Sequence, residues 1–444
     1  MDAERASRPG EQLAVMIDVD GSLLDLRPGL VELLAEWDAR QGTRHFAGLA
    51  PEQVVPGEAG LRRLFDARGL DYTAREELLV ECERFAWSPE AVIGAHRHCL
   101  GMLEVVRWMQ MQPGVECVLN SSRSETRREE TLQALRTLCR HYGVSLREDR
   151  VHLNPFGDGQ GGERAKIEGI EATRARGLRP IAVVDDDPAA LRAIRGWTSD
   201  PSLLCIESAP PLGRDQITEP APVSVVWRGL EDATDLELFG AANVPWAEVR
   251  LVRSASGGLA TVPRRGTPIE LEDLVGCFAQ LGRAMRLRFD EPRAAVRALG
   301  ALAMYRFPWE QVAVRLAPDQ LTDEWFDHLA PHRDRLAVVA DVGFLDGAIG
   351  LGSDLVAEFL LRLTDRGVRR IAVPADATQV DTIRALARAA GLEVELAAPA
   401  GLGAYVDAVF AGADAVSTDF DRARSRGSER AAPANARRRG ALRI

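Results

Sequence analysis

The stretch Ala14-Val15-Met16-Ile17-Asp18-Val19-Asp20-Gly21-Ser22-Leu23-Leu24-Asp25 decides the fold of the N-terminal half of the chain. Its first four residues are all apolar, which predicts a strand buried on both faces of a parallel sheet. The strand runs directly into two carboxylates, Asp18 and Asp20, and Gly21 lets the chain turn sharply after them. Open α/β sheets bind ligands at the carboxyl ends of their strands, so both acids are expected in a functional site.

Two later apolar runs also end in polar residues. Val115–Leu119 leads into Asn120-Ser121-Ser122-Arg123, and Ile181–Val184 leads into Asp185-Asp186. Between these runs lies a predicted helix that carries Lys166, the single lysine of the chain. Because parallel strands end at one edge of the sheet, we expect these side chains to converge near Asp18.

This set of residue types suits transfer of a phosphoryl group to a carboxylate. Such a transfer needs a nucleophile, an acid for the departing oxygen, donors to the phosphoryl oxygens and nearby positive charge. The candidate catalytic residues are Asp18 as nucleophile, Asp20 as acid and base, Ser121 as donor and Lys166 as compact cation. Mg²⁺ prefers carboxylate oxygens, and its candidate ligands are Asp18, Asp20, Asp185 and Asp186. Ser122 and Arg123 are candidate substrate contacts, although Ser122 could be only a turn residue and Arg123 could simply pair with a carboxylate.

The order and the residue sequences of these stretches resemble the four motifs of the haloacid dehalogenase (HAD) superfamily. The matching residues are Asp18-Val19-Asp20-Gly21-Ser22, Ser121-Ser122-Arg123, Lys166 and Val183-Val184-Asp185-Asp186. The resemblance implies a Rossmann-like domain, and an acid at position 20 resembles the phosphatase branch. Ser121-Ser122-Arg123 departs from the pattern, because many relatives have Thr-Gly-Arg or Thr-Asn there.

Residues 26–112 separate the first two motifs and are predicted to be a mostly helical insertion. Apolar residues recur at helical spacing in 59–67, 74–87 and 91–109. The segment is far longer than a single crossover connection needs. In the HAD superfamily a C1-type cap lies at this place, which implies a lid that excludes water and favours small phosphorylated substrates.

The C-terminal half is predicted to be a (β/α)₈ barrel over residues 223–420. A proline-rich linker, 208–222, separates it from the HAD-like domain, 10–207, and the arginine-rich tail, 421–444, is predicted to be disordered. Short apolar strands alternate with helical segments, as such a barrel requires. The predicted strands are Val223–Trp227, Ala247–Val252, Ala284–Phe289, Val312–Leu316, Leu336–Val342, Arg370–Val373, Leu392–Leu396 and Ala413–Ser417.

The order of motifs in this half resembles the glycerophosphodiester phosphodiesterase and phospholipase-C-like barrels, but most catalytic letters of that pattern are missing. Trp227 or Arg228 stands at the place of the first histidine, and Arg250 replaces the metal-binding aspartate after Glu248. Arginine repels divalent cations and cannot act as an acid or base at neutral pH. We therefore expect a barrel without catalysis, with Arg228, Glu248 and Arg250 as its candidate anion site. Arg286 and Arg288 also lie near strand ends, and the alternative is a packed, salt-bridged barrel end without a ligand.

Composition narrows the remaining possibilities. The chain has 444 residues and a net charge of −11, which argues against general affinity for nucleic acids or anionic membranes. No apolar run approaches the roughly 20 residues needed to cross a bilayer. The N-terminus has no apolar core of a signal peptide, so a cytoplasmic protein is expected. Oligomeric state and substrate identity stay open.

The expected function is therefore Mg²⁺-dependent hydrolysis of a small phosphomonoester through an aspartyl-phosphate on Asp18. One alternative is a two-step reaction, in which the barrel cuts a diester and the HAD-like site removes the phosphate. The other alternative is a phospho-ligand-binding protein without turnover. A phosphatase assay with Mg²⁺ separates the enzymatic readings from binding alone.

Overall fold

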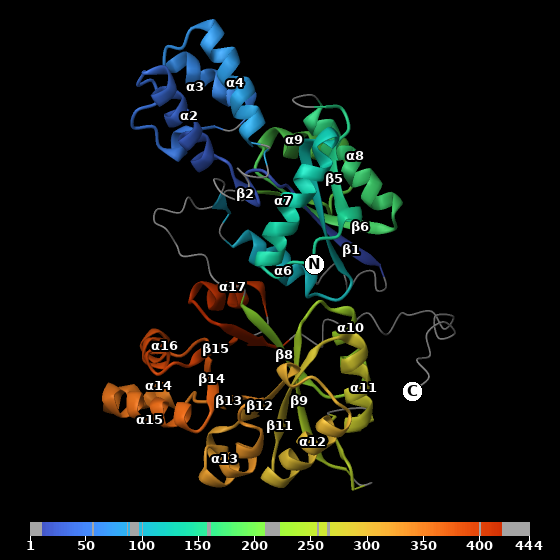
Figure 1. Ribbon diagram of the computed structural model, residues 1–444. Helices are drawn as coiled ribbons and strands as arrows, with labels where there is room; N and C mark the ends of the chain where they lie inside the picture. Colours follow the sequence, from blue (N-terminus) through green and yellow to red (C-terminus); the bar gives the residue numbers. More distant parts are fainter. Residues whose placement is uncertain are drawn as a thin grey trace. The chain divides into compact units, whose positions relative to one another are not determined.

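The computed structural model describes residues 11–55, 57–86, 88, 97–99, 101–157, 161–208, 223–254, 257–263, 267–398 and 401–419. The chain divides into two compact units, Met1–Gln110 with Gly114–Thr218, and Met111–Pro113 with Glu219–Ile444 (Figure 1). The division at Thr218 falls inside the predicted linker. The linker from 209 to 222 and the predicted tail lie outside the described residues.

The first unit contains a five-stranded parallel sheet in the order β5-β4-β1-β6-β7. Its strands are β1 (Gln12–Ile17), β4 (Val115–Ser124), β5 (Val151–Asn154), β6 (Leu178–Asp185) and β7 (Leu204–Glu207). The central strand, β1, pairs with β4 on one side and β6 on the other. The carboxyl ends of β4, β1 and β6 therefore lie next to one another, at the reversal of strand order where α/β sheets hold ligands.

Strand β1 is buried on both faces, as its unbroken apolar run predicts. Leu13, Val15 and Ile17 pack in a cluster with α6 (Met102–Gln110) and α7 (Arg128–His141). Ala14 and Met16 pack in a second cluster with side chains of α8 (Gly162–Ala175) and α9 (Pro188–Trp197). The edge strand β7 was not predicted, and its apolar residues Leu204 and Ile206 are exposed.

The helical insertion has a core of its own. Helices α2 (Arg27–Gln41), α3 (Glu58–Ala67) and α4 (Tyr72–Ala86) pack around a shared apolar cluster. The chain enters through β2 (Leu24–Asp25) and returns through β3 (Arg97–His98), and these two strands pair antiparallel. The described residues of the first unit also form 3₁₀ turns, η1 (Pro51–Gln53), η2 (Glu125–Arg127) and η3 (Glu148–Arg150).

Two predicted boundaries of the insertion are wrong. Arg97–His98 form a strand rather than part of a helix over 91–109, of which 91–96 lie outside the described residues. Helix α6 packs with Leu119 and Val115 in the cluster of the parallel sheet. The insertion therefore ends before Met102 and not at residue 112.

The second unit is a closed barrel of eight parallel strands, all of them predicted. Each strand pairs with the next, and β16 closes the barrel on β8. The strands are β8 (Ser224–Leu230), β9 (Trp246–Arg253), β11 (Ala284–Phe289), β12 (Val312–Leu316), β13 (Ala337–Asp341), β14 (Val368–Pro374), β15 (Glu393–Ala398) and β16 (Ala415–Thr418). A short strand, β10 (Leu259–Thr261), pairs antiparallel with β9 outside this series.

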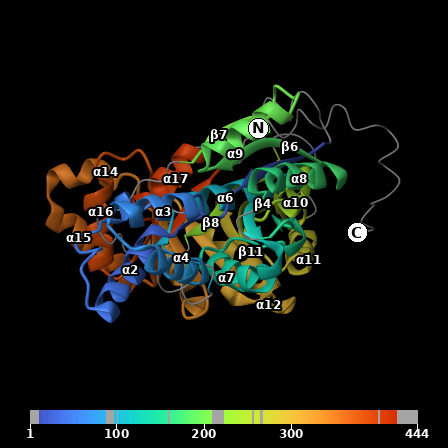
Figure 2. The same cartoon turned by 90° about the horizontal axis from the view of Figure 1, so that it is seen from above.

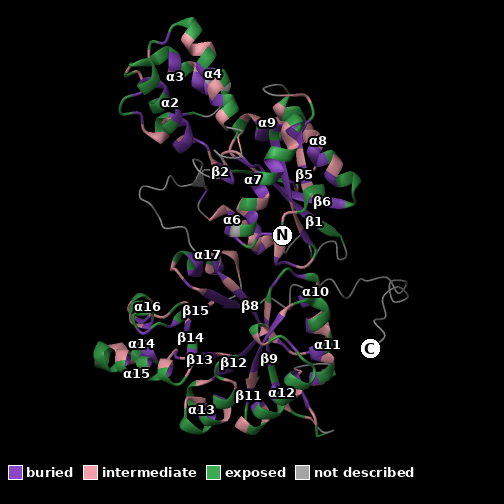
Figure 3. Cartoon of the chain, in the orientation of Figure 1, coloured by how far each residue is buried: buried purple, intermediate pink, exposed green. Residues whose placement is uncertain are grey.

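Helices surround the barrel strands. They are α10 (Ala233–Ala241), α11 (Leu271–Leu281), α12 (Pro292–Met304), α13 (Asp323–Leu329), α14 (Leu345–Ala348), α15 (Ser353–Asp365), α16 (Val380–Ala389) and α17 (Leu402–Phe410). Within this unit, α14 to α17 gather on one side and α10 to α12 on the other (Figure 2). Figure 3 shows the strands buried and the outward faces of these helices exposed. Among the described residues, no helix is both long and apolar enough to cross a bilayer.

Candidate functional site

The turn after β1 fixes Asp18 at the edge of the sheet. The backbone N–H of Asp18 donates to the carbonyl of Val184 at 2.9 Å, which ties the first residue after β1 to β6. The chain then reverses, because Leu23 and Leu24 both donate to the carbonyl of Val19. Gly21 adopts a φ of +79°, a left-handed conformation that favours glycine.

Lys166 lies between two of the predicted carboxylates. Its ammonium donates to Asp18 and makes an ion pair of 2.8 Å with Asp185, and all three side chains are buried. Helix α8 brings the lysine there because Asn120 on β4 donates to the backbone carbonyl of Lys166 at 2.9 Å. A Cβ at Gly169 would lie 2.2 Å from the Asn120 amide oxygen, so α8 approaches β4 closely only with glycine at this position.

The acidic groups perturb one another. Burial raises the pKa of the Asp18 carboxyl well above its ordinary value, and Asp185 and Asp20 add to this rise while Lys166 opposes it. Burial and the charge of Asp185 raise the pKa of Asp186 to about 6. Burial acts to lower the pKa of Lys166, but the charges of Asp18 and Asp185 outweigh it and the pKa rises. The site therefore holds more negative charge than its one lysine neutralises.

Three carboxylates fit a hard divalent cation. Asp18, Asp185 and Asp186 each offer one oxygen, and the three oxygens lie within 4.8 Å of one another. Lys166 balances one of these three charges, which leaves two for a dication to balance. Oxygen ligands from carboxylates are those that Mg²⁺ prefers, so the donor set fits the predicted metal.

Asp20 does not join this group of carboxylates. Both of its oxygens accept hydrogen bonds from Arg123, from Nε at 2.8 Å and from Nη2 at 2.7 Å. The structure pairs Asp20 with Arg123 and does not place the Asp20 carboxylate in the cluster of Asp18, Asp185 and Asp186; the role of Asp20 as a metal ligand and the role of Arg123 as a substrate contact stay predictions. The guanidinium of Arg123 and the carboxylate of Asp20 are hydrogen-bonded to each other.

Ser121 and Ser122 lie on the same strand but in different environments. Leu119 pairs with Ile17 in the sheet, so Ser121 stands just beyond this pair, at the edge where Asp18 lies. The buried Ser121 hydroxyl accepts from the backbone N–H of Arg123 at 3.2 Å, and its own proton stays available to donate. Ser122 is exposed and has Gly162 of α8 as a near neighbour.

Gly21→Ala is expected to disturb the predicted metal site more than the fold. A Cβ at Gly21 would lie 1.8 Å from a carboxylate oxygen of Asp186, so Asp186 would have to move, and φ of +79° adds strain of about 1 kcal/mol or more. We expect at least about tenfold weaker Mg²⁺ binding, by isothermal titration calorimetry. Gly42→Ala is the matched control, because Gly42 also has a positive φ but nothing within 4 Å of the added Cβ. Equal Mg²⁺ affinity in the two variants would contradict the placement of Asp186.

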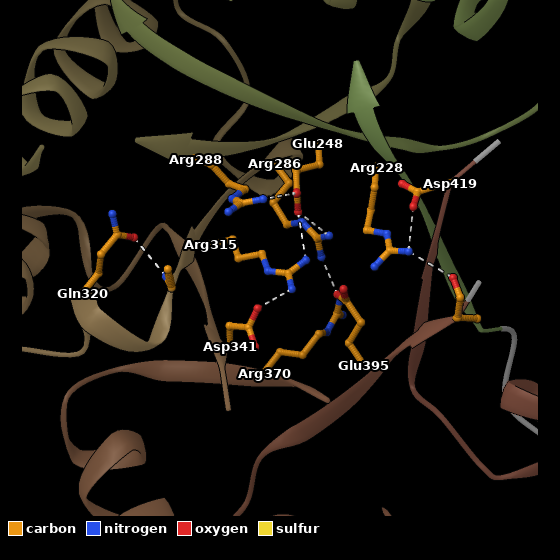
Figure 4. Close-up of polar contacts among 12 residues, drawn as sticks. Arg228, Glu248, Arg286, Arg288, Arg315, Gln320, Asp341, Arg370, Glu395 and Asp419 are labelled. Atoms are coloured by element: carbon orange, nitrogen blue, oxygen red, sulfur yellow. Dashed lines mark hydrogen bonds and ion pairs between the residues drawn. The ribbon is translucent and has the colours of Figure 1, made fainter. Parts of the chain in front are cut away.

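The barrel interior holds a second cluster of charged side chains (Figure 4). Glu248 forms an ion pair with Arg286 at 2.6 Å and accepts hydrogen bonds from Arg315 at 3.2 Å and from Arg288 at 3.3 Å. Arg286 also pairs with the buried Glu395, and Arg315 also pairs with Asp341 at 2.6 Å. The interior of such a barrel is ordinarily filled by branched apolar residues, and here its middle is an ion network.

The predicted anion site of Arg228, Glu248 and Arg250 is not one cluster. The side chain of Arg250 is 52% exposed and pairs with Asp290 at 2.7 Å. Arg228 donates to the carbonyl of Ala398 and to Asp419, both at 3.1 Å. The arginines that contact Glu248 are Arg286, Arg288 and Arg315.

Glu248→Gln is expected to destabilise the barrel in a pH-dependent way. Burial acts to raise the pKa of Glu248, but Arg286, Arg315 and Arg288 outweigh it and lower the pKa from 4.5 to about 2. A lowered pKa stabilises the fold above pH 4.5, and this contribution is lost as the pH falls towards 2. We expect the variant to lose roughly 3 kcal/mol of unfolding free energy at pH 7.

Urea unfolding followed by hydrogen exchange of barrel peptides measures this difference. The difference in unfolding free energy between the wild type and Glu248→Gln should be constant from pH 7 to 5 and should become smaller below pH 4.5. Glu393→Gln is the control, because Glu393 is exposed and lies outside the contacts of Glu248. A gap that does not change with pH would contradict the ion network.

Sequence reasoning missed Arg315, Asp341 and Glu395. For Arg315 the signal was present, since it interrupts the apolar run Val312–Leu316, whereas Glu395 alternates with apolar residues in Leu392–Leu396. A charged residue at an inward position of an apolar strand has to find a partner in the interior. Which strands supply the partners depends on the closure of the barrel.

Comparisons with known proteins assign no family. No protein-family description and no curated protein matches the chain. Solved structures with similar folds include a glycerophosphodiester phosphodiesterase from Parabacteroides distasonis, at 11% identity and TM-score 0.35, covering 47% of this chain and 97% of that one. A glycerophosphodiester phosphodiesterase from Agrobacterium tumefaciens has 12% identity and TM-score 0.32, covering 46% of this chain and 99% of that one.

A HAD-superfamily hydrolase from Geobacter sulfurreducens is similar at 15% identity and TM-score 0.31, covering 45% of this chain and 94% of that one. At these identities and scores the likenesses carry no assignment of activity. The functional reading rests on the two sites described above.

Proposed function

We propose that the first unit is a Mg²⁺-dependent phosphomonoester hydrolase of the HAD type. The observation that carries the proposal is the buried contact of Lys166 with both Asp18 and Asp185, beside Asp186 and at the carboxyl ends of β1 and β6. Four residues from three separate parts of the sequence meet at one point. The arrangement supplies a nucleophile, positive charge and oxygen ligands together, as the reaction requires.

We assign to each residue a role that the reaction requires and that its contacts allow. Asp18 attacks phosphorus, and Lys166 holds the Asp18 carboxylate in place and offsets the charge of the phosphoryl group. Ser121 donates its hydroxyl proton to a phosphoryl oxygen. Asp20 gives a proton to the leaving oxygen and later takes one from the attacking water.

Asp18, Asp185 and Asp186 would hold Mg²⁺, whose charge neutralises phosphoryl oxygens during the transfer. A small substrate is favoured by the helical insertion, whose two connections pair as β2 and β3 beside the turn that carries Asp20. Closure of such an insertion over a site excludes water and admits only small leaving groups.

The test is a screen of the full-length protein against phosphorylated metabolites, including glycerol phosphates and sugar phosphates. We expect phosphate release that needs Mg²⁺ and is abolished by chelation. No release from any of these metabolites, with binding of phosphate nevertheless detected by calorimetry, would favour the reading as a phospho-ligand-binding protein.

Phosphodiester hydrolysis by the barrel is the second candidate, the activity named for the neighbours from P. distasonis and A. tumefaciens. The observation in its favour is an acid, Glu248, inside a closed parallel barrel. Against it, three guanidinium groups contact the Glu248 carboxylate, which leaves this carboxylate poorly suited to hold a metal ion. Glycerophosphodiesters distinguish the two, since diester cleavage that survives Asp18→Asn would come from the barrel.

A further inference from the structure

Arg123 is placed to orient Asp20 rather than to contact substrate. Its side chain is 1% exposed, whereas the Asp20 side chain is 15% exposed and lies on the turn after β1. The two hydrogen bonds between them, at 2.7 and 2.8 Å, leave from adjacent nitrogens of one planar group. Such a bidentate pair fixes both the position and the plane of a carboxylate.

The burial of Arg123 decides which partner can move. A guanidinium pulled away from Asp20 would leave a buried charge without its carboxylate, at a cost of several kcal/mol. The backbone holds Arg123 as well, because its N–H donates to Ser121 and the residue lies within β4. Arg123 is thus a fixed point, and Asp20 is the more exposed group whose orientation depends on it.

Asp20 keeps the capacity for proton transfer in this arrangement. Each carboxylate oxygen has two lone pairs, and Arg123 uses one on each. The second lone pair of either oxygen can carry a proton towards the site. Arg123→Lys would keep the positive charge but lose the planar pair of donors, so the substitution removes orientation without removing the cation.

We propose that Arg123 is a positioning residue that aims Asp20 at the leaving oxygen of the substrate. The inference rests on the proposed phosphatase function. In the first step a bond forms between an Asp18 oxygen and phosphorus, the bond from phosphorus to the leaving oxygen breaks, and that oxygen takes a proton from Asp20. In the second step water attacks phosphorus, gives a proton to Asp20 and releases phosphate from Asp18.

If Asp20 is wrongly oriented, hydrolysis should become slower only for substrates whose leaving group needs a proton. p-Nitrophenolate departs without one, and phenolate from phenyl phosphate is a much poorer leaving group of nearly the same shape. Arg123→Lys is expected to lower kcat for phenyl phosphate about 100-fold, within the usual range for general acid catalysis, and the rate with p-nitrophenyl phosphate only a few-fold. KM should change little for either substrate.

The experiment compares the two substrates within single preparations, so a loss of active protein cancels from the ratio. Asp20→Asn should give the same selectivity, and the double variant should be no more selective than Asp20→Asn alone. Arg147→Lys is the control, because Arg147 also pairs with carboxylates but is exposed. An equal loss on both substrates with a raised KM would show that Arg123 binds phosphate and would overturn the proposal.

Two further outcomes are decisive. If Arg123→Lys does not fold, Asp20→Glu tests the same geometry, because the longer side chain cannot keep both hydrogen bonds to Arg123 and also point at the leaving oxygen. An unchanged selectivity between the two substrates would overturn the proposal. If the wild type cleaves neither the aryl phosphates nor any metabolite of the screen described above, the proposed function fails. The pairing is then tested by the melting temperatures of Asp20→Asn, Arg123→Lys and the double variant, where additive shifts would contradict it.

Discussion

Asp18→Asn is expected to abolish phosphatase activity, with kcat falling at least about 1,000-fold, as for loss of a catalytic nucleophile. The amide has nearly the shape of the carboxylate but cannot form the covalent intermediate. Because Asp18 shares Lys166 with Asp185, the variant still leaves the lysine one buried carboxylate partner. Steady-state kinetics with Mg²⁺ and a substrate found in the screen measures the loss.

Asp187→Asn is the matched control for this substitution. Asp187 follows Asp186 directly, but its carboxylate caps α9 by accepting from the backbone N–H of Ala189 at 2.8 Å. Asparagine caps helices about as well as aspartate, so activity and stability should stay near wild type. Full activity in Asp18→Asn, with the control unchanged, would remove Asp18 from the mechanism.

Lys166→Met is expected to have the second large effect, on both activity and stability. The ammonium of Lys166 is the cation between Asp18 and Asp185, and its side chain is 3% exposed. Removal leaves buried carboxylates without compensation, which costs roughly 3–5 kcal/mol of unfolding free energy. Methionine has a similar length, so lost packing contributes little.

Magnesium separates the electrostatic cause from a general loss of structure. A dication bound by Asp18, Asp185 and Asp186 would replace part of the lost positive charge, so saturating Mg²⁺ should raise the melting temperature of Lys166→Met more than that of the wild type. Thermal denaturation with Mg²⁺ or with chelator measures this difference. An identical shift of the melting temperature in both proteins would contradict the claim that Lys166 and the metal ion balance the same carboxylate charges.

The sequence predicted the parts of this structure that local pattern determines. The apolar run Ala14–Ile17 became β1 because residues buried on both faces show no alternation. The eight strands of the barrel follow from the same signal, repeated with helices between them. Convergence of Asp18, Lys166 and Asp185 was predictable because parallel strands end at one edge of the sheet.

Features that depend on tertiary contact were not predictable in the same way. Helix α6 has the spacing of any amphipathic helix, and only the fold shows that it packs against the sheet and not within the insertion. The bidentate contact of Arg123 with Asp20 joins residues 103 positions apart, so spacing gives no sign of it. The partners of Glu248 come from β11 and β12, and sequence alone does not give the register that brings them inward.

The most direct test of the central claim is a crystal structure of the protein with Mg²⁺ and beryllium fluoride, which mimics an aspartyl-phosphate. We predict beryllium bonded to a carboxylate oxygen of Asp18, with one Mg²⁺ held by Asp18, Asp185 and Asp186 and the Ser121 hydroxyl donating to a fluoride. Beryllium fluoride bound elsewhere, or absent from Asp18 while Mg²⁺ is present, would contradict the account.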